Sequence, residues 1–288
     1  MGTRGWRSPA VSIYRWPRMP AAPGVARGLS AAGVPAWDNV PMAQPTILVF
    51  SAHAADFCSR SGGTLALHAR RGSEVHVVDL TFGERGESED YWARPGPKSV
   101  EECKQVREAE AREAAAVLGA GIQFLDYDDY PLAVNREQVE AMARIIRERR
   151  PDVVLTHWKH EPFNVDHEVT AGAVLRAAGA AAVPGFDHEA GKVAFPYIFA
   201  FEPTIPRDDA TGFSPDHYID IGDVYEVKME ALRKLRSQSK LVRFYTQWAE
   251  YRGFQAAQSS GRPVRYAEAF QRYTAVVDTR LPFPETAA

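Results

Sequence analysis

Cysteine is scarce in this sequence. Cys58 and Cys103 are its two cysteines in 288 residues, too few for the disulfide framework of a small secreted domain. We therefore predict a reducing compartment and expect the protein in the cytoplasm. Long apolar runs are also missing, because no stretch approaches the roughly 18 consecutive apolar residues of a membrane-spanning helix. We accordingly expect no membrane partner.

A strong charge of either sign is absent as well. The net charge is −3 at pH 7, which gives no basic field for a nucleic acid, so we expect no nucleic-acid partner. Acidic residues are scarce in residues 1–41, where Asp38 is accompanied by five arginines and six prolines. This composition resembles an organellar transit peptide, but the prolines disfavour an amphipathic helix. We interpret residues 1–41 as a disordered leader or an upstream-extended start, and residues 42–288 as a single α/β domain.

Strand-like and helix-like patterns alternate along the rest of the chain. Short apolar runs predict strands, and longer amphipathic stretches predict helices between and after them. Such alternation predicts an α/β fold, with a Rossmann-like, mostly parallel sheet and helices on both faces. The predicted strands are 46–52, 74–81, 122–127, 152–157, 197–201 and 218–221, and the predicted helices are 62–71, 100–118, 135–150, 167–179 and 224–237.

Three polar residues follow two of the predicted strands. His53 and Asp56 come after the first strand, and His167 lies in the loop behind residues 152–157. Parallel strands expose their carboxyl ends at one edge of a sheet, where ligands bind. A His/Asp/His set with an open fourth position is the arrangement of a catalytic zinc ion. The spacing alone is unspecific, because a single His after a strand is more often a capping or packing residue.

These motifs resemble those of the zinc-dependent de-N-acetylases, the PIG-L or LmbE-like family. That family typically reads AHPDDE, then GG, then GExGE after the second strand, and closes its site with HPDH. The resemblance implies the family's fold and one zinc ion per subunit, or another divalent metal, held by His53, Asp56 and His167. The corresponding segments here are AHAADF at 52–57, GG at 62–63, GERGE at 83–87 and NVDH at 164–167.

Two departures from the family pattern change the expected activity. Ala55 stands where the deacetylases have their general base, and Asn164 replaces the His that steadies their oxyanion. The chain is more similar to the subgroup that hydrates 4-oxalomesaconate, over about residues 42–257, including AFEP at 200–203. This resemblance implies a zinc-dependent hydratase of gallate and protocatechuate degradation. Its product is 4-carboxy-4-hydroxy-2-oxoadipate.

Hydration of a conjugated double bond requires a proton acceptor and a proton donor. Because Ala55 carries no acid, Glu84 or Glu87 is the nearest replacement in the loop after the second strand, and we favour Glu87. From composition alone this GERGE loop is a solvated charged turn. Asn164 is expected to hydrogen-bond a substrate carboxylate or the enolate.

The implied substrate is a small tricarboxylate, so cationic groups are expected around it. Arg107 matches the substrate-facing arginine of the family, and a guanidinium suits bidentate carboxylate binding. Without that resemblance, Arg107 is one more exposed charge on a helix with many ion pairs. Arg85 and His157 are further candidates.

Two other questions stay open at the level of sequence. Residues 243–254 mix aromatic and basic side chains with acids, which favours core packing or a subunit interface. Members of the family commonly oligomerise, so we expect a homo-oligomer. The alternatives to a hydratase are a de-N-acetylase whose base has moved to Glu84 or Glu87, and a non-catalytic relative that keeps the metal and binds a carboxylate ligand.

Overall fold

A seven-stranded sheet forms the centre of the molecule. The computed structural model describes residues 44–187, 191–205 and 208–276, and within these the strand order is β3-β2-β1-β4-β5-β7-β6. The first five strands are parallel, whereas β7 pairs antiparallel with both β5 and β6. The strands are β1 (Ile47–Ser51), β2 (Val75–Asp79), β3 (Gly121–Phe124), β4 (Val153–Thr156), β5 (Tyr197–Phe201), β6 (His217–Asp220) and β7 (Ala267–Arg272).

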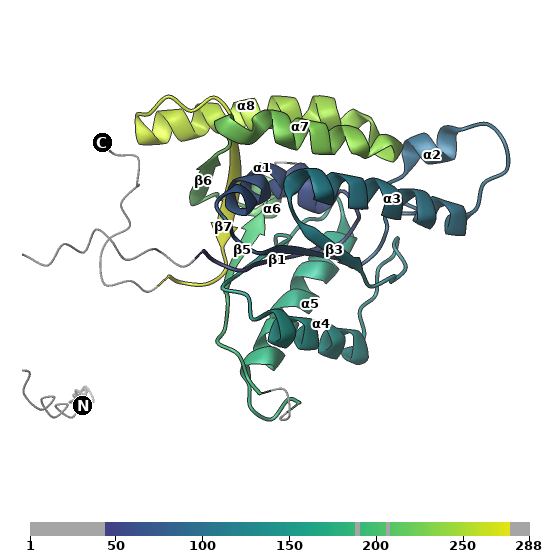
Figure 1. The fold of residues 1–288 in the computed structure, drawn as a ribbon, viewed down its shortest axis with the longest axis vertical. Helices are drawn as coiled ribbons and strands as arrows, with labels where there is room; N and C mark the ends of the chain where they lie inside the picture. The colour runs from purple at the N-terminus through teal and green to yellow at the C-terminus, as the bar shows by residue number, and fades with distance from the viewer. Residues whose placement is uncertain (1–43, 188–190, 206–207, 277–288) are drawn as a thin grey trace, which may run out of the picture. The chain divides into compact units, whose positions relative to one another are not determined.

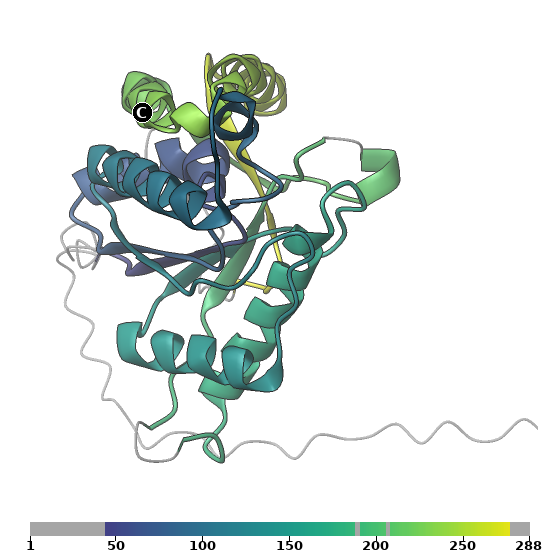
Figure 2. The same ribbon diagram turned by 90° about the vertical axis from the view of Figure 1, so that its right-hand side faces the viewer.

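Helices cover both faces of this sheet (Figures 1 and 2). One face carries α1 (Asp56–Arg70), α3 (Val100–Leu118), α7 (Tyr225–Lys234) and α8 (Lys240–Ser260). The other face carries α4 (Arg136–Arg149) and α5 (Val165–Ala182), and two short helices are α2 (Glu89–Ala93) and α6 (Asp208–Thr211). The predicted α/β architecture with a mostly parallel sheet and helices on both faces is confirmed.

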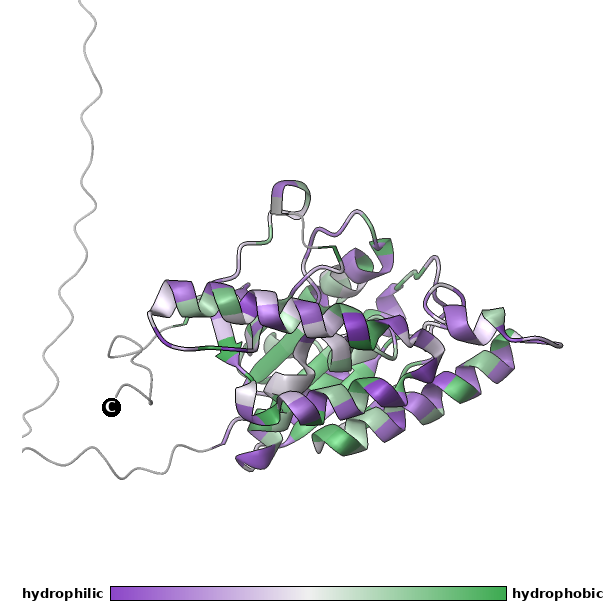
Figure 3. Cartoon of the chain, turned by 90° about the horizontal axis from the view of Figure 1, so that it is seen from above, coloured by the Kyte–Doolittle hydropathy of each residue, from purple (hydrophilic) through white to green (hydrophobic). Residues whose placement is uncertain are grey.

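The core consists of two apolar layers separated by the sheet. Ile47 and Val49 pack into the layer beneath α1, whereas Leu48 and Phe50 pack into the layer beneath α5. Because side chains alternate along a strand, β1 must be apolar at every position to bury both faces. Figure 3 shows the resulting pattern, with apolar strands lying between helices that carry hydrophilic residues.

The first helix begins earlier than predicted. We expected it to start at residue 62, but α1 starts at Asp56. The glycine pair lies inside the helix. Gly63 packs closely against another segment, which explains the absence of a side chain, because a Cβ there would lie 2.7 Å from Cγ2 of Ile221. The pair therefore marks a close approach between elements and does not mark a helix start. As a consequence, Asp56 and Arg60 lie one helical turn apart.

The C-terminal elements also differ from the prediction. The helix expected over 224–237 ends at Lys234 and is followed by the 3₁₀ turn Arg236–Gln238. The aromatic segment at 243–254 lies within α8. Strand β7 was not predicted, because its sequence AEAFQR includes the buried polar residue Glu268 and gives no clear apolar run.

No helix in the described residues has the length and apolarity needed to cross a membrane. The leader predicted over residues 1–41 lies outside the described part of the chain.

Candidate metal centre

The three predicted ligands meet at the carboxyl edge of the sheet. His53 lies in the loop after β1, Asp56 is the first residue of α1, and His167 is in the first turn of α5. His53 Nδ1 lies 3.3 Å from Asp56 Oδ2 and 3.3 Å from His167 Nε2, and the Asp56 oxygen lies 3.4 Å from the same nitrogen. With Glu87, these residues offer four donor atoms within 4.8 Å of one another.

A carboxylate holds the second ring nitrogen of each histidine. His167 Nδ1 lies 2.9 Å from Glu161 Oε2, and His53 Nε2 lies 3.3 Å from Asp166 Oδ2. Glu161 also accepts a hydrogen bond from the backbone N–H of Thr204, and Asp166 accepts two from the segment before α4. Such carboxylate–histidine pairs fix the tautomer and orientation of metal-binding imidazoles.

The electrostatic environment of this cluster is strongly negative. Burial by itself lowers the pKa of both imidazoles, but the carboxylates around them outweigh it, so the pKa of His53 is well above and that of His167 above the ordinary value. Burial tends to raise the pKa of Asp56, but the neighbouring His167 imidazole keeps that pKa well below its usual range. The cluster thus favours added positive charge.

This donor set fits a divalent metal ion. Two imidazole nitrogens and carboxylate oxygens are the ligands that zinc takes in catalytic sites. His53 and His167 are fully buried and their outer nitrogens are already held. The geometry, the negative field and the second layer of carboxylates agree with one another, so these residues can hold a metal without rearrangement of the elements that carry them.

The loop after β2 directs Glu87 toward the cluster. Gly83 allows the turn because its φ is +70°, a left-handed conformation that other residues rarely adopt. Glu87 Oε1 lies 3.3 Å from His53 Nδ1 and accepts a hydrogen bond of 2.9 Å from Asn164 Nδ2. Asn164 occupies the N-cap position of α5, yet its side chain makes no capping bond and orients Glu87 instead.

Glu84 lies on the other side of the same loop. It is completely buried, and its Oε1 accepts from Arg85 at 3.1 Å and lies 3.7 Å from Nζ of Lys104. Burial raises the pKa of its carboxyl group. Of the two acids predicted for proton transfer, Glu87 is the one that the fold brings to the metal cluster.

A cavity of about 210 Å³ opens beside the cluster. Asp56, Glu87 and Asn164 form part of its wall, so the cavity reaches the proposed metal ligands. Gly86 permits the Tyr130 ring to close one side, since a Cβ at Gly86 would collide with that ring. The described residues that complete the lining are Ala55, Ser59, Arg60, Glu89, Phe163, Thr204, Ile205, Gln238, Lys240, Leu241 and Tyr245.

Arg107 is buried outside this lining. Its Nε donates to the carbonyl of Phe82 at 3.0 Å, and its Nη2 donates to Gln238 Oε1 at 2.8 Å. Gln238 in turn lies 3.4 Å from Glu87 Oε2. The side chain has no exposed area, so in this geometry Arg107 holds the loop around Glu87. Direct contact with substrate, as the sequence suggested, stays a prediction.

His157 and Arg85 also lie away from the cavity wall. His157 is fully buried, stacks on His167 at 3.9 Å, and accepts a hydrogen bond on Nε2 from the backbone of Ala52. Burial lowers its pKa to about 3, so it is a neutral packing partner of a ligand. Arg85 is 40% exposed and pairs with Asp128 at 3.1 Å. Their predicted substrate contacts have no counterpart among the cavity residues.

Three residues of the site were missed from the sequence. Glu161 and Asp166 hold the two histidines, and Arg60 holds Asp56 through an Nε–Oδ1 hydrogen bond of 3.2 Å. The i, i+4 spacing of Asp56 and Arg60 is a signal for this pair, but it appears only when the helix is started at Asp56. Glu161 gives no local signal, because its role depends on how the loop before α5 folds.

Known proteins are similar to this chain in sequence and in architecture. The family model described as PIG-L, GlcNAc-PI de-N-acetylase, matches residues 48–178. A 4-oxalmesaconate hydratase from Pseudomonas putida KT2440 is 37% identical over 81% of this chain and 91% of its own length. The chain belongs to the PIG-L family. A diacetylchitobiose deacetylase from Thermococcus kodakarensis is 29% identical over 67% of this chain and 69% of its own length.

A solved structure supports the same membership. The crystal structure of GalB, a 4-carboxy-2-hydroxymuconate hydratase from Pseudomonas putida KT2440, matches with a TM-score of 0.78 and 36% identity, covering 83% of this chain and all of that one. In this PIG-L family member, Ala55 and Asn164 lie at the N-caps of α1 and α5, the two helices that carry the proposed metal ligands. The departures from the deacetylase pattern are therefore at the site itself.

Proposed function

We propose that this protein is a zinc-dependent hydratase that adds water to 4-oxalomesaconate and forms 4-carboxy-4-hydroxy-2-oxoadipate. The observation that carries the proposal is the 37% identity to a 4-oxalmesaconate hydratase over 91% of that enzyme. The structurally similar GalB is described as acting on 4-carboxy-2-hydroxymuconate, which is the enol form of the same tricarboxylate. The reaction belongs to the breakdown of gallate and protocatechuate.

His53, Asp56 and His167 are the residues that would hold the zinc ion, which supplies Lewis acidity to a water molecule or to a substrate oxygen. Glu87 accepts the proton of the attacking water, because its carboxylate lies beside the three proposed ligands and also borders the cavity. Asn164 keeps Glu87 in place by donating to Oε1. Ala55 is the N-cap residue of α1 and has a small, uncharged side chain at the position where the resemblance places the general base of a deacetylase.

The test follows the conjugated chromophore of the substrate. Purified, zinc-loaded protein should remove the ultraviolet absorbance of 4-oxalomesaconate, a chelated sample should not, and mass spectrometry should find the hydroxy-tricarboxylate. Unchanged absorbance with a folded, fully metallated protein would contradict the proposal.

Two alternatives make different predictions in the same experiment. A de-N-acetylase, to which the family model and the diacetylchitobiose deacetylase point, would release acetate from an N-acetylated sugar and leave 4-oxalomesaconate intact. A non-catalytic relative would bind the tricarboxylate without turnover. We also propose that the protein assembles as a homo-oligomer, which light scattering at several concentrations would test.

A further inference from the structure

A tricarboxylate in the cavity needs cationic partners close to the metal. The arginines predicted for this task, Arg85 and Arg107, lie outside the lining, and among the described lining residues the cations are Arg60 and Lys240. Lys240 is 68% exposed and pairs with Glu89 at 2.6 Å. Arg60 is 6% exposed and lies next to Asp56. The buried cation of the cavity is therefore Arg60.

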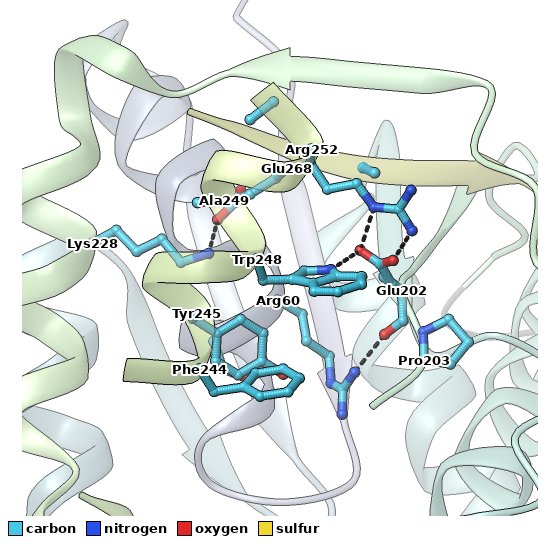
Figure 4. Close-up of a pocket in the computed structure, with 13 residues that line it drawn as sticks. Arg60, Glu202, Pro203, Lys228, Phe244, Tyr245, Trp248, Ala249, Arg252 and Glu268 are labelled. Atoms are coloured by element: carbon cyan, nitrogen blue, oxygen red, sulfur yellow. Dashed lines mark hydrogen bonds and ion pairs between the residues drawn. The ribbon is translucent and has the colours of Figure 1, made fainter. Parts of the chain in front are cut away.

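Three acceptors of the protein hold the Arg60 guanidinium in one orientation. Nε donates to Asp56 Oδ1 at 3.2 Å, Nη1 donates to the carbonyl of Glu202, and Nη2 donates to Thr204 Oγ1 at 2.7 Å. A guanidinium has five N–H groups, so two are left for another acceptor. Figure 4, which draws a second pocket that Arg60 also lines, shows the side chain reaching from α1 toward Glu202 and Pro203.

Residues 202–204, which accept hydrogen bonds from Arg60, are themselves held in place by α8. The Glu202 carboxylate accepts hydrogen bonds from Arg252 and from the indole N–H of Trp248 (Figure 4). Thr204 donates its backbone N–H to Glu161 Oε1 at 2.6 Å, and Glu161 holds the ligand His167. Glu202 and Thr204, at the end of the AFEP run and just after it, thus connect α8 to Arg60 beside Asp56 and to Glu161 beside His167. A guanidinium held this way loses little entropy when it binds an anion.

We propose that Arg60 binds one carboxylate of the substrate in the cavity and thereby makes the site specific for polycarboxylates. The inference rests on the proposed hydratase function and names the residue that recognises its substrate. The unused N–H groups of Arg60 form a charge-assisted pair with the carboxylate. Its bond to Asp56 Oδ1 leaves the other oxygen of Asp56 facing the metal cluster, so the bound carboxylate lies beside the reaction centre.

The experiment measures carboxylate binding separately from turnover. Tricarballylate, a stable tricarboxylate without the reacting double bond, is titrated into zinc-loaded wild type, Arg60→Gln and Arg60→Lys by calorimetry. Loss of charge-assisted hydrogen bonds predicts a ten- to hundredfold weaker Kd for Arg60→Gln, with a similar rise in KM for 4-oxalomesaconate. Arg60→Lys keeps the positive charge but lacks the planar guanidinium, so its Kd should lie between those of wild type and Arg60→Gln. Arg112→Gln, on the surface of α3, is the matched control and should bind as wild type.

Each outcome separates this inference from the proposed function. An unchanged tricarballylate Kd and KM in Arg60→Gln would overturn the role of Arg60 while hydration by wild type continued to support a hydratase. Arg60-dependent tricarballylate binding without hydration by wild type would support the role and overturn the hydratase. If Arg60→Gln loses zinc through Asp56, the comparison is repeated with both proteins stripped of metal, and equal affinities there would overturn the proposal.

Discussion

His53 and His167 present different ring nitrogens to the metal cluster. His53 uses Nδ1 and His167 uses Nε2, and a carboxylate holds the opposite nitrogen in each case. Glu87 reaches the cluster from a different loop and, besides the proposed ligand Asp56, is the acid of the cluster that borders the cavity. The chemistry of the site thus depends on which atom of each side chain faces inward, and two predictions follow at this scale.

Glu87→Gln should lower kcat for hydration by about 10²- to 10⁴-fold, the usual contribution of a general base. Glutamine has nearly the same shape but cannot take a proton from water. Zinc content, measured by plasma mass spectrometry, should stay at the wild-type level because the His53, Asp56 and His167 donors are untouched. Glu84→Gln is the comparison variant, since Glu84 points away from the cluster. Full turnover by Glu87→Gln would refute the role of this residue.

Glu161→Gln should weaken zinc binding by about ten- to hundredfold, because Glu161 orients the His167 ring through its Nδ1. His167→Ala removes the ligand itself and should lose metal and activity together. Competition with a chelator of known affinity measures both effects. A His167→Ala protein that still binds one zinc per chain would show that the proposed ligand set is wrong.

At the scale of elements, α1 is the helix to which the rest of the site is attached. It carries Asp56 and Arg60 at its start, and the buried Glu268 of β7 binds it further along. Glu268 accepts from the backbone N–H groups of Gly63 and Thr64 and pairs with the buried Lys228 of α7 at 2.6 Å. One carboxylate therefore ties α1, α7 and β7 together. Figure 4 shows its pair with Lys228 of α7.

Glu268→Gln should lower the free energy of unfolding by about 3–5 kcal/mol, because it leaves the Lys228 ammonium buried without a counter-charge. Urea unfolding followed by circular dichroism gives the value. The double variant Lys228→Met/Glu268→Gln should recover part of the loss, since no buried charge remains. Glu226→Gln on the exposed side of α7 is the control. A loss below about 1 kcal/mol for Glu268→Gln would contradict this account.

At the scale of the whole molecule, stability depends on groups buried beneath the site. Asp79, at the end of β2, is completely buried, and neither of its carboxylate oxygens has a hydrogen-bond partner among the described residues. Burial raises the pKa of Asp79 well above its ordinary value of 3.8. The folded protein therefore keeps a proton on Asp79 at pH values where the unfolded chain has released it.

The sign of the pH dependence follows from this difference. Above pH 3.8 the unfolded chain binds fewer protons at this position than the fold does, so the contribution of Asp79 to stability is lost as pH rises toward the folded pKa. Asp79→Asn cannot titrate. The free energy of unfolding of Asp79→Asn minus that of wild type should therefore increase by up to about 1.4 kcal/mol for each unit by which the pH rises. Denaturation of both zinc-loaded proteins from pH 5 to pH 8 measures the difference, and parallel curves would exclude the effect.

The N-terminal segment provides a second prediction at this scale. All residues of the proposed site belong to the unit of the chain that begins at Ala43. Deletion of residues 1–41 should therefore leave kcat/KM for 4-oxalomesaconate and the melting temperature unchanged. An inactive or unfolded truncated protein would show that the leader interpretation is wrong.

The sequence predicted the parts of this protein that depend on local pattern. Apolar runs located β1, β2 and β4, and the loops behind β1 and β4 carried His53, Asp56 and His167 to one edge of the sheet. Ligand binding at the carboxyl edge follows from parallel connectivity, so this placement needed no coordinates. The role of Arg60 was missed because the start of α1 was placed too late in the chain. Glycine normally marks a helix terminus, and only a tertiary contact explains why Gly63 lies inside the helix.

The sequence by itself determined the α/β class, the family and the candidate metal ligands, because each depends on residue type and spacing along the chain. Only the tertiary structure decided which charges face the cavity. The sequence placed Arg107 on a predicted helix and Arg60 in a loop before one, yet the fold buries Arg107 within the protein and places Arg60 in the cavity wall. That choice depends on where α8 and the Glu202 segment pack, and long-range packing leaves no periodic signal in the chain.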